Sequence, residues 1–190
     1  MMKPKKDNKF PLEGNLEKRW SGRIYADKPV EKDDLLSLFE AARWSASCFN
    51  EQPWRFLVGV KGEETYDKIF DMLVEFNQDW AKTAPVLVLA YAKKTFTKNG
   101  KPNMHYWYDT GQAMASLTVQ ATHLDLNVHQ MGGYDRDRAQ KELIQDDDFE
   151  SICVAAIGYR AEPSDVPENL KEREFAPQTR LALKEVIKGI

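Results

Sequence analysis

Two short stretches of this sequence place polar side chains where they could bind a ligand, and the first is RWSGR. In an extended segment, side chains two positions apart point to the same side. Arg19, Ser21 and Arg23 would then present two guanidinium groups and a hydroxyl together, a good arrangement for holding an anion. A solvated edge that binds nothing is the alternative interpretation of the same residues.

The second stretch is SASCFNEQPW, which lies between an apolar helical pattern and an apolar strand pattern. Ser47, Asn50 and Gln52 supply hydrogen-bond donors and acceptors, and Pro53 restricts the backbone to an extended conformation where the strand begins. These side chains either cap the helix end and the loop themselves or hold the polar chain or ring edge of a ligand. The stretch taken alone favours neither interpretation.

Other kinds of site are not indicated by the sequence. It has no G-x-G-x-x-G and no G-x-x-x-x-G-K-[ST] segment, so we expect no nucleotide site of the Rossmann or P-loop type. His105, His123 and His129 share no metal-ligand spacing with the cysteines, and we expect no metal site. No G-x-S-x-G segment marks a nucleophilic serine.

The composition predicts one globular domain over residues 1–190, with a polar N-terminal arm over residues 1–16. The 27 basic and 30 acidic residues give a net charge of −3, which favours neither nucleic acid nor a membrane surface as a partner. The longest apolar run, residues 84–92, is too short to cross a bilayer. The two cysteines and the lack of a secretion signal lead us to expect a cytoplasmic protein.

Helical and strand patterns alternate along the chain. We expect helices over residues 31–47, 63–82, 104–126 and 137–144, strands over 54–60, 85–92 and 151–162, a short strand with a glycine turn over 127–135, and a last short helix within 169–190. This interleaving predicts a layered α/β or α+β domain, and it leaves the direction of the strands open.

Taken together, the two polar stretches resemble the nitroreductase family of FMN-dependent, NAD(P)H-using oxidoreductases. Members carry R-x-S-x-R and, one helix later, P-S-x-x-N-x-Q-P-W, which correspond here to RWSGR and ASCFNEQPW. DTGQAMASLTVQATHLDL resembles the core helix of the family, MGGYD its flavin-facing loop and AAIGYR its last core strand. The similarity extends from about Glu17 to the C-terminus, and Ala46 departs from the pattern because it replaces the usual proline.

The resemblance implies an α+β fold with three layers, in which helices flank a mostly antiparallel central sheet. It also implies an intertwined homodimer with two FMN sites at the interface. By this resemblance, the phosphate and ribityl chain of FMN would be bound by Arg19, Trp20, Ser21, Arg23 and Arg180. The other subunit would contact the flavin through Ala46, Ser47, Cys48 and Asn50. The flavin ring would lie with its N5 near Gln130, Met131, Gly132 and Gly133 and its pyrimidine edge near Asn77.

The implied activity is transfer of hydride from NADH or NADPH through flavin N5 to a nitroaromatic, a quinone or a similar flat acceptor. One site serving both steps implies ping-pong kinetics, and no side chain is assigned a catalytic role. The loop 93–103 and the aromatic run Tyr106, Trp107 and Tyr108 either line the substrate side or pack in the dimer.

Three alternatives stay open at this point. The same resemblance fits relatives that dehydrogenate, dehalogenate or fragment flavin, because fold-level likeness does not choose the reaction. A flavin-binding dimer without turnover and an interaction module without flavin are the others.

Overall fold

The computed structural model describes residues 6 and 8–189 of the chain. Its centre is a four-stranded sheet of order β1-β2-β4-β3, and every neighbouring pair is antiparallel. The strands are β1 (Trp54–Val60), β2 (Val86–Lys93), β3 (Leu126–Met131) and β4 (Phe149–Tyr159). This sheet confirms the α+β fold class that the resemblance implies.

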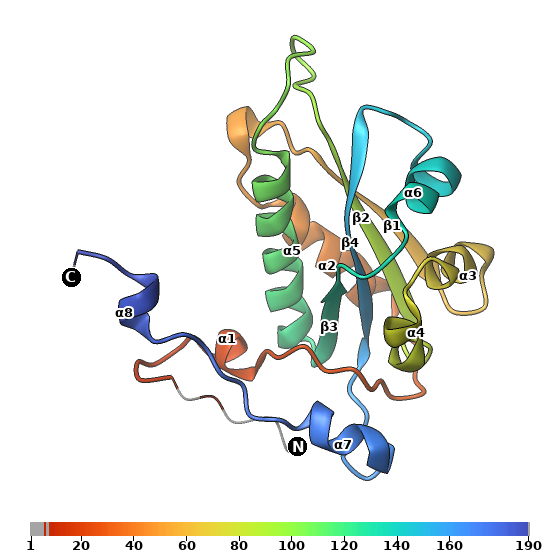
Figure 1. Cartoon of the computed structure of the whole chain (residues 1–190), viewed down its shortest axis with the longest axis vertical. Helices are drawn as coiled ribbons and strands as arrows, with labels where there is room; N and C mark the ends of the chain where they lie inside the picture. Colours follow the sequence, from red (N-terminus) through yellow and green to blue (C-terminus); the bar gives the residue numbers. More distant parts are fainter. Residues whose placement is uncertain (1–5, 7, 190) are drawn as a thin grey trace.

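Helices cover both faces of the sheet (Figure 1). They are α1 (Gly14–Lys18), α2 (Lys32–Arg43), the 3₁₀ turn η1 (Cys48–Asn50), α3 (Glu64–Asp71), α4 (Glu75–Ala81), α5 (Tyr106–His123), α6 (Arg136–Arg138), the π-helical turn η2 (Ala139–Ile144), α7 (Glu168–Glu174) and α8 (Leu183–Val186). The expected N-terminal arm over residues 1–16 lies partly outside the described residues, and α1 begins within it.

The central strand β2 is apolar throughout because helices pack on both of its faces. Val86 and Val88 face a cluster that includes α2 and α5, whereas Leu87 and Leu89 face a second cluster that includes α3 and α4. All four side chains are buried. Since side chains alternate along a strand, a continuous apolar run is what a sheet covered on both sides requires. The three expected layers follow from this arrangement.

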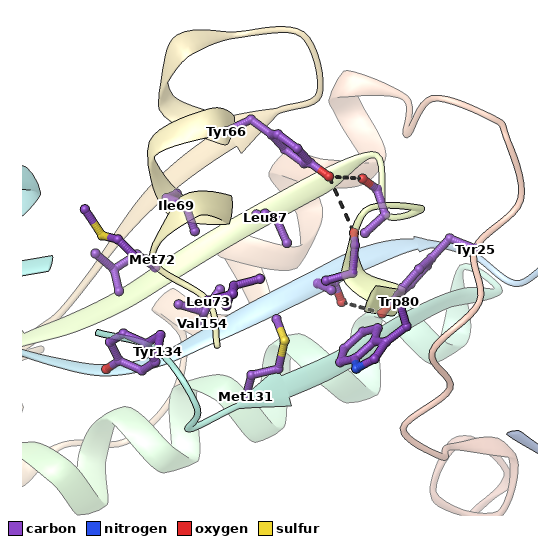
Figure 2. Packing of buried hydrophobic residues seen from close by; sticks show 14 of the residues in the cluster. Tyr25, Tyr66, Ile69, Met72, Leu73, Trp80, Leu87, Met131, Tyr134 and Val154 are labelled. Atoms are coloured by element: carbon purple, nitrogen blue, oxygen red, sulfur yellow. Dashed lines mark hydrogen bonds between the residues drawn. The ribbon is translucent and has the colours of Figure 1, made fainter. Parts of the chain in front are cut away.

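The second cluster contains two tyrosines whose hydroxyl groups are satisfied by backbone carbonyls (Figure 2). The Tyr66 hydroxyl donates to the Ala84 carbonyl at 2.9 Å, and the Tyr25 hydroxyl donates to the Ala156 carbonyl at 3.0 Å. These bonds fix α3 and the N-terminal segment against the sheet, because a buried hydroxyl without a partner would destabilise the fold.

The helix expected over residues 63–82 is wrong as a single element. The chain forms α3 and α4 instead, and Leu73 forms an antiparallel bridge with Tyr134 between them. The Val74 N–H donates to the Gly133 carbonyl and the Asp135 N–H donates to the Met72 carbonyl. Backbone pairing with the segment after β3 therefore interrupts a pattern that is helical in its sequence, and this brings α4 beside that segment.

Candidate functional site

The backbone of the segment Arg19–Arg23 is held by polar side chains from β3 and α7. Asn127 accepts from the Gly22 N–H at 3.3 Å and donates to the Gly22 carbonyl at 2.9 Å. A Cβ atom on Gly22 would lie 2.7 Å from Glu174 Oε1, so a larger residue here would displace the Glu174 carboxylate. Trp20 is buried and Ser21 is exposed, as expected for alternating sides of an extended segment.

His129 adds a further contact to the same segment. Its Nδ1 lies 3.1 Å from the Gly22 carbonyl, and its ring lies 4.5 Å from that of Trp80. Burial lowers the pKa of His129 to about 4, and the nearby charge of Arg23 contributes. The neutral ring therefore donates its Nδ1–H, because a carbonyl oxygen only accepts.

Five guanidinium groups gather around this segment although they are far apart in the sequence, and we call them the arginine cluster. Burial lowers the pKa of Arg19, and the nearby charge of Arg180 lowers it further. Burial also lowers the pKa of Arg23, and the nearby charge of Arg173 adds to this effect. The members of the arginine cluster are Arg19, Arg23, Arg160, Arg173 and Arg180.

No member of the arginine cluster forms an ion pair with a carboxylate among the residues that the structure describes. The Arg23 Nε atom is buried without a hydrogen-bond partner in this part of the chain. Arg160 and Arg173 stack on the rings of Trp20 and Phe76, at 3.7 and 3.9 Å. Guanidiniums that form no ion pair and keep free donors are suited to a multiply charged anion such as a phosphate group.

The predicted residues at the end of β3 and just after it have different neighbours, and Gly133 lies against Asn77 on α4. The Asn77 side-chain amide donates to the Gly133 carbonyl at 3.0 Å, and a Cβ on Gly133 would lie 2.9 Å from that amide. Met131 is buried in the core. The Gln130 amide donates to the Thr118 hydroxyl on α5 at 3.3 Å. The structure thus joins Asn77 to this loop, which presents mainly backbone at Gly132 and Gly133.

The predicted turn from Ala46 to Gln52 is held partly by its own groups. The Ser47 hydroxyl accepts from the Gln52 N–H at 3.0 Å, and the Cys48 N–H donates to Asp109 Oδ2 at 3.0 Å. Asn50 and Gln52 have positive φ values of 57° and 50°. The self-capping interpretation therefore accounts for the Ser47 hydroxyl, whereas the Asn50 side chain stays exposed and available.

Within one chain, the structure does not bring this turn to the arginine cluster. The turn is bonded to Asp109 in the first turns of α5, and the Arg19–Arg23 segment is bonded to Asn127, just beyond the other end of that helix. Eighteen residues of helix span about 27 Å. Figure 1 shows the two regions at opposite ends of α5.

The aromatic run at the start of α5 is bound on one side and open on the other. The Tyr106 hydroxyl donates to a Glu150 carboxylate oxygen, and the Arg136 guanidinium lies 5.5 Å from the Trp107 ring. Tyr108 is 69% exposed, so its ring is not used inside the chain. In the expected substrate-side loop, the Phe96 ring lies 5.9 Å from that of Phe49 in the turn.

Sequence reasoning missed Asn127, His129 and Glu174. Asn127 and His129 are two positions apart on β3, so their alternation carried a signal for a shared polar face. Glu174 lies in a polar C-terminal segment, where nothing in the sequence distinguishes a carboxylate that will be buried from those that stay exposed.

The described part of the chain offers neither a membrane span nor a metal site. No helix within residues 6 and 8–189 is long and apolar enough to cross a membrane. No group of three or more histidine, cysteine or acidic side chains in that part of the chain could hold a metal ion.

Comparisons with known proteins agree with this architecture. A crystal structure of an "oxidoreductase containing FMN" is 34% identical, covers 96% of this chain and 93% of its own, and superposes with a TM-score of 0.89. A nitroreductase family protein of Clostridium difficile 630 is 25% identical with a TM-score of 0.71, and the alignment covers 92% of this chain and 95% of that one.

Two relatives carry names that state an activity. A Streptomyces coelicolor protein, provisionally named NADH dehydrogenase/NAD(P)H nitroreductase, is 28% identical over 73% of this chain and 78% of its own length. The major NAD(P)H-flavin oxidoreductase of Aliivibrio fischeri is 32% identical over 47% of this chain and 42% of its own.

The family model agrees with the resemblance found in the sequence. The Nitroreductase family model matches residues 16–77 and 63–159, which together make up most of the chain. The matched ranges contain both polar stretches, the core helix α5 and all four strands. The chain therefore belongs to the nitroreductase family.

Proposed function

We propose that this chain is an FMN-dependent oxidoreductase that passes hydride from NADH or NADPH to a nitroaromatic, a quinone or a similar flat acceptor. Two similar proteins support the proposal: the 34% identical structure is of an oxidoreductase containing FMN, and the Aliivibrio fischeri relative is named for NAD(P)H and flavin. Bound FMN would supply the redox chemistry, since a flavin takes hydride from a nicotinamide and passes electrons on.

The observation that carries the proposal is the arginine cluster, no member of which forms an ion pair among the described residues. The charge of Arg180 acts on Arg19, the charge of Arg173 acts on Arg23, and the buried Arg23 Nε has no hydrogen-bond partner among the described residues. The phosphate of FMN would satisfy these donors, and Ser21 would bind beside it, because the Arg19 guanidinium already lies 3.3 Å from its hydroxyl.

The loop after β3 fits the flavin ring on geometric grounds. A Cβ on Gly132 would meet nothing within 4 Å, so this backbone is open to a flat group, whereas Asn77 holds the loop from behind through Gly133. Backbone that lacks a side chain allows the close approach that a planar ring needs. We assign to this chain's residues the tasks of binding and orienting the ring, and we assign none of them a catalytic role.

A homodimer would complete the site. The Ser47–Asn50 turn and the arginine cluster lie at opposite ends of α5, so a turn that contacts the flavin must come from a second copy. We therefore propose that Ala46, Ser47, Cys48 and Asn50 of one subunit face the flavin held by the other. Donor and acceptor would then use one face in turn, which gives ping-pong kinetics.

The first test is the visible spectrum of the purified protein under anaerobic conditions, before and after NADH and then NADPH. We expect a flavin spectrum that one or both nucleotides bleach, and that a nitroaromatic or quinone restores. A protein that takes up no FMN after reconstitution, or flavin that neither nucleotide bleaches, would contradict the proposal.

The phosphate assignment has its own test in Arg23→Ala. Loss of a charge-assisted contact worth about 1.5–3 kcal/mol should weaken FMN binding roughly ten- to hundredfold. Arg43→Ala is the matched control, since Arg43 is exposed on α2 and paired with Glu40. Equal FMN affinity in the two variants would show that Arg23 does not bind the phosphate.

A further inference from the structure

Glu174 is a buried carboxylate beside two members of the arginine cluster, Arg23 and Arg160. It is 7% exposed and comes from α7, far in sequence from the segment that it contacts. Its charge acts on Arg23 and on Arg160, where it opposes the lowering of both pKa values by burial. Burial raises the pKa of Glu174 itself, so the protein stabilises this carboxylate less than water does.

The carboxylate binds a backbone group instead of a guanidinium. Glu174 Oε2 accepts from the Arg23 N–H at 2.8 Å, and Oε1 lies over Gly22 at the distance where a Cβ would clash. Among the described residues it forms no ion pair with an arginine. A carboxylate beside guanidiniums often pairs with one of them in a bidentate fashion. Here the backbone bond leaves the guanidiniums available to another anion.

This arrangement gives Glu174 two separable effects on a bound anion. The hydrogen bond to the Arg23 N–H fixes the backbone from which that guanidinium projects, and Asn127 fixes the same backbone from the other side at Gly22. The negative charge opposes the positive potential of the arginine cluster and therefore weakens its attraction for a phosphate. The first effect favours anion binding and the second limits it.

We propose that Glu174 is a positioning residue that holds Arg23 for the phosphate end of the flavin and limits how strongly the site prefers FMN over riboflavin. The inference rests on the proposed FMN site. It extends that site to a residue whose influence passes through the Arg23 backbone and through its charge, without contact with the flavin ring.

The test compares binding of FMN and riboflavin to the flavin-free protein, measured by flavin fluorescence quenching. Glu174→Gln keeps an acceptor for the Arg23 N–H and removes the charge, so the preference for FMN over riboflavin should rise roughly three- to tenfold. Glu174→Ala also removes the acceptor, and it should bind FMN at least about fivefold more weakly than Glu174→Gln. Glu172→Gln is the matched control, because Glu172 is exposed on the same helix.

The outcomes separate the two claims. If wild-type protein binds neither flavin, the proposed function fails. The other two outcomes overturn the role of Glu174 in a wild-type protein that does bind FMN. In the first, Glu174→Gln keeps the wild-type preference for FMN over riboflavin, as the control Glu172→Gln does. In the second, Glu174→Ala binds FMN as tightly as Glu174→Gln does.

Glu174→Asp covers the case in which Glu174→Gln does not fold. Aspartate keeps the charge but loses reach to the Arg23 N–H, so FMN should bind more weakly, whereas riboflavin, which has no phosphate, should bind as it does to wild type. FMN binding to Glu174→Asp as tight as to wild type contradicts the proposal.

Discussion

The neighbouring residues Gly132 and Gly133 differ in what an added methyl group would meet. At Gly133 it would lie 2.9 Å from both the Asn77 amide and a Val74 methyl, whereas at Gly132 nothing lies within 4 Å. Neither residue has a positive φ, so the difference is one of space alone. Substitution of Gly133, with the same substitution of Gly132 as its control, therefore tests the contact between α4 and the loop after β3.

We expect Gly133→Ala to destabilise the protein by about 1–3 kcal/mol, because Asn77 or the loop must move. Gly132→Ala should change stability by less than about 0.5 kcal/mol. Urea denaturation of the two variants beside wild type measures this. Equal stabilities would show that the loop does not pack on α4 as described.

His129 makes stability depend on pH. Its pKa is lowered to about 4 in the folded chain, mainly by burial, against an ordinary value of 6.5. The unfolded chain therefore binds a proton that the folded chain does not between these values, and stability falls as the pH decreases from 6.5 toward 4. Glu174, whose pKa burial raises, has the opposite effect.

His129→Asn should reduce this dependence, because an asparagine amide can still donate to the Gly22 carbonyl but does not titrate. The measurement is the free energy of unfolding of variant and wild type at several pH values between 4 and 7. His123→Asn serves as the control, since His123 is exposed at the end of α5. If the free energy of unfolding changes with pH equally in the two variants, His129 is not held neutral in the folded protein.

Residue by residue, the sequence predicted the groups with a motif and missed those without one. Arg19, Ser21 and Arg23 follow a period-two pattern, and they lie in an extended segment. Glu174 could not be predicted, because its burial depends on α7 folding back over Gly22. The flavin roles of all these residues stay predictions.

Among the elements, local patterns predicted strands well and one helix poorly. Residues 54–60 form β1 as expected, because an apolar run after Pro53 has no competing helical pattern. Residues 63–82 keep a helical pattern throughout, yet Leu73 bridges to Tyr134 and separates α3 from α4. That bridge joins residues about sixty positions apart, so it could not be predicted from the hydrophobic pattern of residues 63–82 alone.

Asp109 couples the Ser47–Asn50 turn to α5. It is 2% exposed and accepts from the Cys48 N–H at 3.0 Å. Asp109→Ala leaves that donor unpaired, so we expect a loss of about 1–3 kcal/mol in stability. Thermal unfolding checks this against Asp137→Ala, an exposed acidic residue on α6. Similar melting temperatures for both variants would show that the turn is held by other contacts.

For the whole molecule, exposed apolar side chains suggest which regions a second copy covers. Phe49 and Tyr108, near the start of α5, are 91% and 69% exposed, Trp44 at the end of α2 is 76% exposed, and Leu181 in the C-terminal tail is 69% exposed. A chain of 21.9 kDa that exposes such groups should assemble in solution. Light scattering should give twice that mass, and a monomer at micromolar concentration would contradict the proposed dimer.

The central claim is that each flavin site combines the arginine cluster of one chain with the Ser47–Asn50 turn of another. Arg23→Ala and Asn50→Ala each damage a different half, so each variant alone should hold FMN weakly. In a mixed dimer of the two, one site carries both changes and the other carries neither.

Mixing the two variants after reversible dissociation and measuring bound FMN tests this claim most directly. Random exchange makes about half of the dimers mixed, so about a quarter of all sites should recover wild-type FMN affinity. If the mixture binds no more FMN than the average of the two separate variants, although mixed dimers form, each site is built within one chain and the account is wrong.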